Sequence, residues 1–285
     1  TLTNLLDKVK GIAEKIQKNT STMIPDQQFL SQEQVATTVL TLADDEQAKI
    51  LNGKVIPGDR VFYPVKSHIK SSVPKVEKNY MDRERVHMTG SDDQRIDSIE
   101  SMIEEKGGEI NRLRAADYIT ETYTVYPGSL FIHFTGNVPN FSKLTELTRD
   151  EWNKLVDQFI NTPAAFTQMA LRNFVSGGSD DPRLFKDVRG RIIIIGPALP
   201  VGKKISGHER AKVEVFRGLL RPFATTVNQE LSDVLKSNIR VFLILPGTVD
   251  GKEPNDENIV NTINYLMSDE AASSSEVIFC PDETR

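Results

Sequence analysis

Two uninterrupted apolar runs constrain the fold of this chain more than any other feature. Residues 191–195 read RIIII, and residues 240–245 read RVFLIL before Pro246 and Gly247 stop the run. A strand with one face in water alternates apolar and polar residues, whereas a strand covered on both faces is apolar throughout. The two runs therefore predict central strands of a parallel sheet that has helices on both faces.

An alternation of strands and helices surrounds these runs. Further strands are predicted at 84–90 (ERVHMTG), 108–113 (GEINRL) and 129–138 (SLFIHFTGNV), and a weaker pattern at 114–128 suggests one more. Helices are predicted between them, because apolar residues there recur every three or four positions. The alternation from 84 to 280 predicts an α/β fold with a doubly wound, mostly parallel Rossmann-type sheet and helices on both faces.

Two long helices of this unit carry recognisable signals. The first opens with a capping box, Thr148-x-x-Glu151, and Pro163 should kink or interrupt it. Its predicted buried stripe consists of Trp152, Leu155, Val156, Phe159, Phe166 and Met169. The second helix follows Gly207 and contains Pro222, and its apolar stripe consists of Val213, Phe216, Leu220, Phe223, Val227 and Leu231.

The stripe of the second helix is wider than one sheet-facing stripe needs. Phe216, Leu220 and Phe223 extend it, so the sequence predicts a second buried surface over helices 149–174 and 207–236. We expect this face to dock the equivalent helices of another module. Truncating Phe223 to alanine would then weaken the docking by roughly 2–4 kcal/mol.

Composition excludes several functional classes. The chain has 35 Lys and Arg against 40 Asp and Glu without a basic block, so no nucleic-acid partner is predicted. Its apolar runs are far shorter than the ~20 residues that span a bilayer, so no membrane association is predicted. The single cysteine, Cys280, fits a reducing cytoplasm. His68, His87 and His133 lack Cys, Asp or Glu companions at ligand spacing, so no metal site is predicted.

A helix-turn-strand unit occurs twice in the sequence. Residues 35–59 align with 259–283, pairing Val35 with Ile259 and Val39 with Ile263, and a VI pair ends each copy. Such self-similarity indicates a duplicated module. The predicted organisation is therefore the tail of an upstream module at 1–58, a linker at 59–83 and a full module at 84–285. The apolar face of the first copy, which includes Val35 and Val39, is expected to pack on a segment of another module.

Several segments in this order resemble the short-chain dehydrogenase/reductase family. They are FTGN (134–137), EWNKLVDQFINTPAAF (151–166), GRIIIIGPA (190–198), HERAK (208–212), IRVFLILPG (239–247) and YLMSDEAASSSEVIF (265–279). The resemblance covers residues 84–283. It implies a glycine-rich cofactor loop after the first strand, an NAG motif after the fourth, a catalytic serine after the fifth and a YxxxK motif in the next helix.

The sequence departs from that pattern at the cofactor positions. The loop reads TGSDDQRI, so Gly90 is present, but Asp92 and Asp93 stand where backbone amides must approach a pyrophosphate. Gly136 and Asn137 belong to TGN, which replaces NAG. Gly90, Gly136 and Asn137 are thus the candidate cofactor-binding residues of a degenerate site, and we expect no dinucleotide to bind there in the usual way.

The catalytic positions depart as well. The serine position falls on Pro197, and YxxxK becomes His208-x-x-x-Lys212. Phe159 stands where the family places a helix asparagine. Two interpretations of His208 stay open. It can be a general acid beside Lys212, since imidazole donates protons near neutral pH, or a polar residue at a helix start with no chemical role.

The segment GLLRPFATTVNQE (218–230) is similar to a helix of the degenerate copy in bimodular enzymes of the malonyl-CoA reductase type. This resemblance implies a non-catalytic module that supports and dimerises a catalytic short-chain dehydrogenase module, in the same or another chain. The parent enzyme would reduce malonyl-CoA with NADPH, through malonate semialdehyde, to 3-hydroxypropionate. The alternatives are an active NAD(P)H-dependent oxidoreductase that uses His208 and Lys212, and a module that senses CoA or a nucleotide.

Overall fold

The computed structural model describes residues 31–43, 76–91, 94–113, 130–140, 143–174, 189–199, 207–247, 255–273, 277–279 and 281. They fall into two units. One contains helix α2 (Gln32–Ala43), which confirms the helix expected in the first copy of the repeated unit. The other, drawn from residues 67–205 and 212–284, holds the sheet. The strand expected in that first copy, the strand suggested at 114–128 and Cys280 lie outside the described residues.

Within the described ranges, six strands form one sheet in the order β2-β1-β3-β4-β5-β6, and each neighbouring pair is parallel. The strands are β1 (Arg85–Gly90), β2 (Glu109–Arg112), β3 (Leu130–Phe134), β4 (Arg189–Ile195), β5 (Asn238–Ile244) and β6 (Ile278–Phe279). The parallel, doubly wound sheet is thereby confirmed. The two runs that predicted it, β4 and β5, lie side by side, with Ile193 opposite Phe242.

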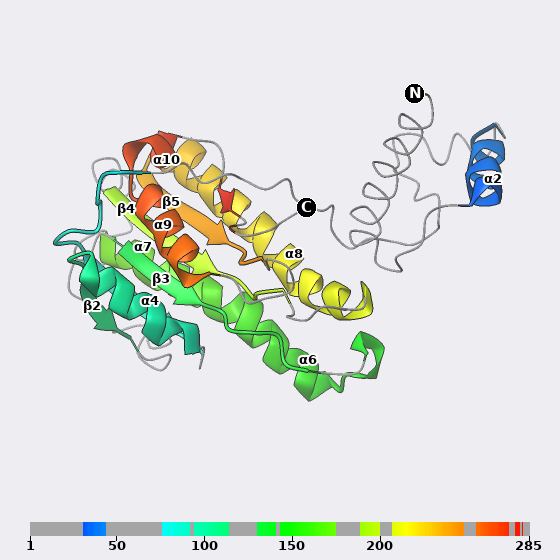
Figure 1. The fold of residues 1–285 in the computed structure, drawn as a ribbon, viewed down its shortest axis with the longest axis horizontal. Coiled ribbons are helices and arrows are strands. Elements are labelled where there is room, and N and C mark those ends of the chain that lie inside the picture. The colour runs from blue at the N-terminus through cyan, green and yellow to red at the C-terminus, as the bar shows by residue number, and fades with distance from the viewer. Residues whose placement is uncertain are drawn as a thin grey trace, which may run out of the picture. The chain divides into compact units, whose positions relative to one another are not determined.

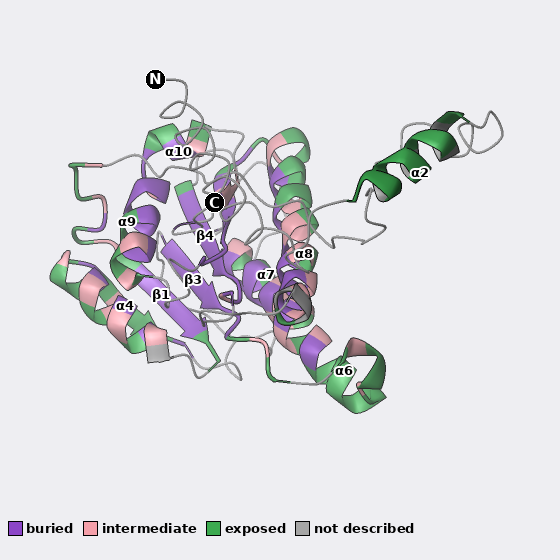
Figure 2. Cartoon of the chain, turned by 45° about the vertical axis from the view of Figure 1, so that its right-hand side comes forward, coloured by how far each residue is buried: buried purple, intermediate pink, exposed green. Residues whose placement is uncertain are grey.

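Helices cover both faces of the sheet, and alternate residues of each strand point to opposite faces. On one face Leu130 and Ile132 pack with α4 (Gln94–Glu105) and α9 (Asp256–Leu266). On the other face Phe131 and Ile192 pack with α7 (Thr162–Phe174) and α8 (Gly207–Gln229). Figures 1 and 2 show these helices on opposite sides of the strands. The uninterrupted apolar runs follow from this double coverage.

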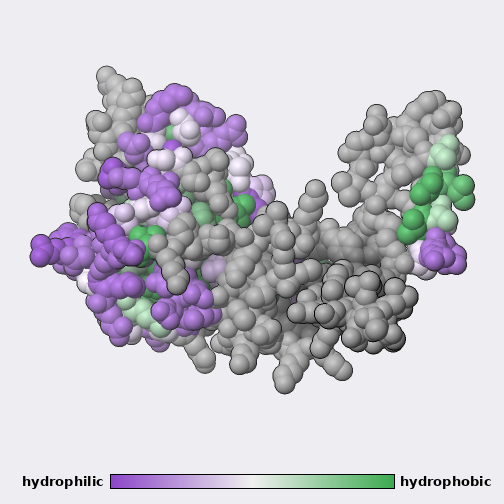
Figure 3. All heavy atoms as spheres, turned by 45° about the horizontal axis from the view of Figure 1, so that its top comes forward, coloured by the Kyte–Doolittle hydropathy of each residue, from purple (hydrophilic) through white to green (hydrophobic). Residues whose placement is uncertain are grey.

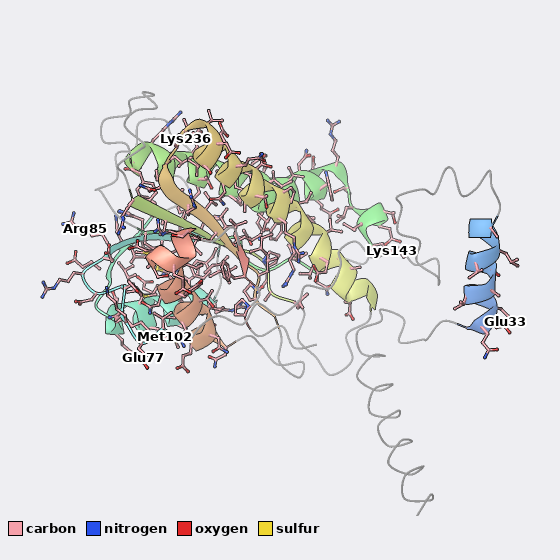
Figure 4. All side chains as sticks on the ribbon, turned by 90° about the horizontal axis from the view of Figure 1, so that it is seen from above. Glu33, Glu77, Arg85, Met102, Lys143 and Lys236 are labelled. Carbon is pink, nitrogen blue, oxygen red and sulfur yellow. The ribbon has the colours of Figure 1, made fainter. Side chains whose placement is uncertain are left out.

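Residues 76–84 belong to the packed α/β unit, although the sequence placed 59–83 in a linker. The Asn264 side chain in α9 accepts from the Tyr80 N–H (2.8 Å) and donates to the Lys78 carbonyl (2.9 Å). Met81 is fully buried against α4 and α9. Figure 4 labels Glu77 in this segment beside Met102 of α4. Packing against the module therefore begins before the first strand.

The helix after β3 begins and changes pitch as the sequence predicts. Thr148 and Glu151 form both halves of the capping box at the start of α6 (Arg149–Val156). A π-helical turn, Asp157–Asn161, then joins α6 to α7, which carries Pro163 near its start. Since proline lacks an N–H, the regular hydrogen-bond ladder is interrupted there. Trp152 is 39% exposed, so its place in the buried stripe was wrong; it lies at the start of α6, beyond the sheet.

The predicted docking surface on α8 needs correction. Phe216 and Leu220 are 0% and 1% exposed, so they are buried within the chain itself. Phe216 stacks near Phe159 of the π-helical turn, with ring centroids 4.7 Å apart, and Leu220 packs in the sheet-facing core. The wide apolar stripe on α8 is thus buried within the same chain on two surfaces. One part packs against the sheet, and the other packs against the preceding helix. Only Phe223 of the three is partly accessible.

The side-chain amide of Asn228 takes the place of strand hydrogen bonds along part of β5. β6 pairs with β5 only at Leu243 and Ile244. Earlier along β5, Asn228 of α8 accepts from the Val241 N–H (3.0 Å) and donates to the Val241 carbonyl (2.5 Å). β4 pairs with Val241 on the other side, so Asn228 satisfies these backbone groups on the side where the described part of β6 does not reach. Among the described helices, none is long and apolar enough to cross a bilayer.

Candidate functional site

The carboxyl ends of β1 and β3 form the topological switch point of the sheet. From β1 the chain crosses to β2 on one side, and β3 lies on the other side of β1. In doubly wound sheets ligands bind in the crevice at such a point. Gly90 ends β1 opposite Phe134, and Gly136 and Asn137 follow β3 directly. The structure therefore brings the predicted cofactor residues together at this edge.

The two glycines have steric reasons of their own. A Cβ on Gly90 would lie 2.6 Å from the Phe134 Cβ, so glycine allows β1 and β3 to approach each other. Gly136 has a positive φ of 76°, which side chains rarely adopt, and a Cβ there would overlap the Ser91 hydroxyl. The glycines are thus required by the fold itself, whether or not a ligand binds.

Side chains of the same chain fill the hydrogen-bonding positions at this edge. The Ser91 hydroxyl donates to the Thr135 carbonyl (3.1 Å), and the Ser91 N–H donates to the Phe134 carbonyl (3.4 Å). Gln158, in the π-helical turn, donates to the Thr135 carbonyl (2.7 Å) and to the Asn137 carbonyl (3.4 Å). Asp92 and Asp93 lie outside the described residues. Sequence reasoning missed Ser91 and Gln158; only Pro163, which signals the irregular turn, pointed indirectly to Gln158.

The carboxyl ends of β4 and β5 are tied to each other in a similar way. Pro197, at the position that the resemblance assigns to a serine, is buried and follows β4. The Gly196 N–H donates to the Ile244 carbonyl (2.8 Å), and the Leu199 N–H donates to the Pro246 carbonyl (3.4 Å). Arg217 of α8 is fully buried and donates to carbonyls in both loops. No sequence motif indicated Arg217.

The candidate catalytic pair lies in the first turns of α8. His208 is the second residue of the helix, but its side chain lies outside the described residues. Lys212 is half-buried one turn later. The helix thus holds the two residues at the spacing that the sequence predicts.

Two polar side chains are buried beneath this edge. Thr89 and His133 are opposite each other on β1 and β3, and each is 2% exposed. Neither the Thr89 hydroxyl nor the His133 ring nitrogens have a hydrogen-bond partner within the part of the chain that the structure describes. Burial lowers the pKa of His133 to about 3, so the imidazole is neutral. The described residues contain no group of three His, Cys, Asp or Glu that can hold a metal ion.

Comparisons with known proteins agree on the fold. No protein-family model matches the sequence, and no curated protein matches it. A 3-ketoacyl-(acyl-carrier-protein) reductase from Brucella melitensis, solved with NADH, superposes with a TM-score of 0.51 at 11% identity, over 70% of this chain and 97% of its own. A 4-hydroxyisoleucine dehydrogenase, solved with NADH and succinate, gives a TM-score of 0.50 at 17% identity, over 70% and 98%. The chain therefore has the Rossmann-like fold of short-chain dehydrogenases/reductases.

Proposed function

We propose that this α/β unit is a non-catalytic short-chain-dehydrogenase-like module of an NADPH-dependent enzyme of the malonyl-CoA reductase type. In this role it supports and dimerises a catalytic module that acts on malonyl-CoA and malonate semialdehyde. One observation carries the proposal. At the carboxyl ends of the central strands, where such a fold binds ligands, Ser91, Gln158 and Arg217 donate to loop carbonyls of the same chain.

In this proposal no dinucleotide binds to the module in the usual way. A pyrophosphate needs backbone N–H groups that face the crevice. The Ser91 N–H donates instead to Phe134, and the Ser91 hydroxyl lies directly over Gly136. In the sequence, two carboxylates follow at 92 and 93, and they would repel a phosphate. NADPH therefore belongs to the partner module in this proposal.

Pro197 stands at the position that the resemblance assigns to the catalytic serine. Reduction of a thioester or an aldehyde requires a hydrogen-bond donor at the carbonyl oxygen where negative charge develops. Pro197 has no side-chain donor and no N–H, and its own carbonyl accepts from Arg217 at 3.3 Å. The hydrogen bond from Arg217 holds the loop after β4 in place. Pro197 itself provides no donor that could polarise a substrate carbonyl.

The direct test is turnover by the full chain. We expect no NADPH-dependent reduction of malonyl-CoA or malonate semialdehyde above the rate of a heat-denatured control. Turnover that is abolished by His208→Ala or Lys212→Ala would instead establish the active oxidoreductase that uses this pair.

We also propose that residues 1–58 are the tail of an upstream module. Support comes from comparing α2 with α9, its counterpart in the internal repeat. Ile263 of α9 is 0% exposed against the sheet, whereas the aligned Val39 of α2 is 58% exposed. Figure 3 shows this apolar surface of α2 in green. An amphipathic helix with this pattern needs a sheet to cover it.

A partner surface remains on the α6–α8 side after the correction above. Trp152 and Leu219 are 39% and 38% exposed, and Trp152 lies 6.3 Å from the Phe216 ring of α8, one helical turn from Leu219. We propose that the matching helices of the catalytic module dock here. Exposed apolar groups of this size are typical anchors of an interface.

Sedimentation of the chain with the catalytic module tests this surface. We expect Leu219→Asp to weaken association by about 2 kcal/mol or more, because a charge would be buried on docking. Gln168→Asp, at an exposed polar position on α7, is the matched control and should leave association unchanged. Equal affinities for both variants would show that the catalytic module does not dock on this face.

A further inference from the structure

A buried arginine lies where the two loops of the substrate half meet. Arg217 is 0% exposed, although α8 carries it close to the edge of the sheet at which ligands bind in this fold. We propose that the Arg217 guanidinium is an internal ligand that holds residues 196–199 after β4 and residues 245–247 after β5 together. This inference goes beyond the proposed function, since it concerns what joins the two strand ends and not whether the module is catalytic.

The hydrogen bonds of Arg217 connect the two loops. Its Nη1 donates to the Pro246 carbonyl at 2.7 Å and to the Pro197 carbonyl at 3.3 Å. Pro246 follows β5 and Pro197 follows β4, so a single nitrogen reaches both strand ends. The Pro246 carbonyl also accepts from the Leu199 N–H at 3.4 Å. Buried carbonyls need a donor, and a guanidinium from a neighbouring helix supplies it here.

Charges on the same helix face hold the guanidinium in place. Glu214 lies one turn before Arg217, with its Oε2 3.6 Å from the Arg217 Nε. Arg221 lies one turn after Arg217, with its Nη2 3.9 Å from the same oxygen. The Glu214 and Arg221 side chains are only 10% and 12% exposed. A buried cluster of charged side chains such as Glu214, Arg217 and Arg221 is costly to desolvate and adds little net stability. Its effect is therefore to fix the position of the guanidinium.

The residues that Arg217 joins are buried and closely packed. Pro197, Leu199 and residues 245–247 are all buried. A Cβ on Gly196 would lie 2.7 Å from the Leu245 side chain and 3.1 Å from that of Leu220, so the segment directly after β4 packs closely against the end of β5 and against α8. The Arg217 guanidinium thus supplies hydrogen bonds to carbonyls that packing has removed from solvent.

Chemical rescue tests the proposal on the full chain. Arg217→Ala should lower the midpoint of thermal unfolding by about 10 °C, because it leaves Glu214 buried without its nearest cation. Methylguanidinium at millimolar concentration should bind the resulting cavity and restore part of this loss in a saturable way. Methylammonium, which has the same charge but one donor centre, should not. Arg221→Ala is the matched control: it removes the other guanidinium beside Glu214, one turn further along α8, and no rescue of the Leu199 and Pro246 contacts is expected.

Hydrogen exchange provides the second readout. The Leu199 amide, which donates to the Pro246 carbonyl, should exchange at least about tenfold faster in Arg217→Lys, because one ammonium cannot reach both carbonyls and Glu214 together. If Arg217→Ala fails to fold, this variant decides the question. The proposal is overturned by unchanged exchange in Arg217→Lys, by a midpoint within about 2 °C of wild type in Arg217→Ala, or by equal rescue with methylammonium. Neither readout uses activity, so failure here is separate from failure of the proposed function.

Discussion

At both ends of the sheet, side chains donate hydrogen bonds to backbone carbonyls. The accepting carbonyls belong to helices at the amino ends of the strands and to loops at the carboxyl ends. At the amino ends of the strands, Arg191 donates to the Leu266 carbonyl at the end of α9 (3.2 Å), and Arg240 donates to the Ala272 carbonyl in α10 (Asp269–Ser273; 3.2 Å). At the carboxyl ends, Ser91, Gln158 and Arg217 donate to loop carbonyls. Figure 4 labels Arg85 and Lys236 at the first end and Lys143 at the second.

The comparison bears on function because the two ends normally differ. The amino end of such a sheet serves stability, and cations there complement helix carboxyl termini. The carboxyl end normally keeps its polar groups for a ligand. Among the described residues of this chain, the side chains named above bind the protein backbone at both ends. The carboxyl end differs from the amino end in one respect. It contains the buried Thr89 and His133 side chains, which have no hydrogen-bond partner among the described residues.

The largest effect is expected at the amino end. Arg191 is 5% exposed, and its guanidinium also donates to the Gly190 and Asn238 carbonyls at 2.9 and 3.1 Å. Arg191→Ala should lower the free energy of unfolding by about 3–5 kcal/mol in urea denaturation, since two buried carbonyls and one partly buried carbonyl lose this donor. Arg189→Ala, which breaks a largely exposed pair with Asp269, is the control and should cost less than about 1 kcal/mol. Similar losses for both would show that the amino end is not held by Arg191.

An intermediate effect is expected from His133 at the carboxyl end. Its pKa falls to about 3 on folding because of burial, so below pH 6.5 the unfolded chain binds a proton that the folded chain does not. Stability from this group is therefore complete above pH 6.5 and decreases as the pH falls toward 3. Between pH 7 and pH 5 the loss should be about 2 kcal/mol.

Comparison with His133→Phe isolates that contribution. Urea denaturation at pH 5 and pH 7 should show that the variant lacks the loss of about 2 kcal/mol, whereas the contributions of other histidines cancel between the two proteins. Parallel pH dependences for the variant and the wild type would mean that His133 is hydrated or paired in solution.

A small effect is expected from Ser91. Ser91→Ala removes one hydrogen bond to the Thr135 carbonyl near the surface and should lower the free energy of unfolding by about 0.5 kcal/mol. Ser101→Ala is a suitable control, because that hydroxyl bonds only within α4, to the Asp97 carbonyl. A loss of unfolding free energy above about 2 kcal/mol would show that Ser91 holds β1 to β3, beyond occupying a hydrogen-bonding position in the crevice.

Much of the fold was predictable because burial on both faces leaves a direct pattern in the sequence. The runs that became β4 and β5 and the capping box at Thr148 were recognised in this way. The errors arose where one helix has two neighbours. Phe216 was assigned to an outside partner because a single helix gives no sign that α6 and the π-helical turn cover its second face.

The site was only half predictable. The family resemblance placed Gly90 and Gly136 at this edge, and the structure gives both a backbone reason. A cofactor-binding role for them and for Asn137 stays a prediction. Gln158 and Arg217 could not be found, since a polar residue in an amphipathic helix normally indicates solvent. Their roles depend on the irregular turn before Pro163 and on the order of the strands, which bring distant carbonyls within reach.

Binding of NADPH to the full chain tests the central claim most directly. In a fluorescence titration we expect neither quenching nor a shift of nicotinamide emission up to about 1 mM, which corresponds to binding weaker than about 4 kcal/mol. Ser91→Ala should behave like the wild type, because the two carboxylates at 92 and 93 remain. Saturable binding in the micromolar range by the wild type would contradict the account and show that the carboxyl end of the sheet still accepts a dinucleotide.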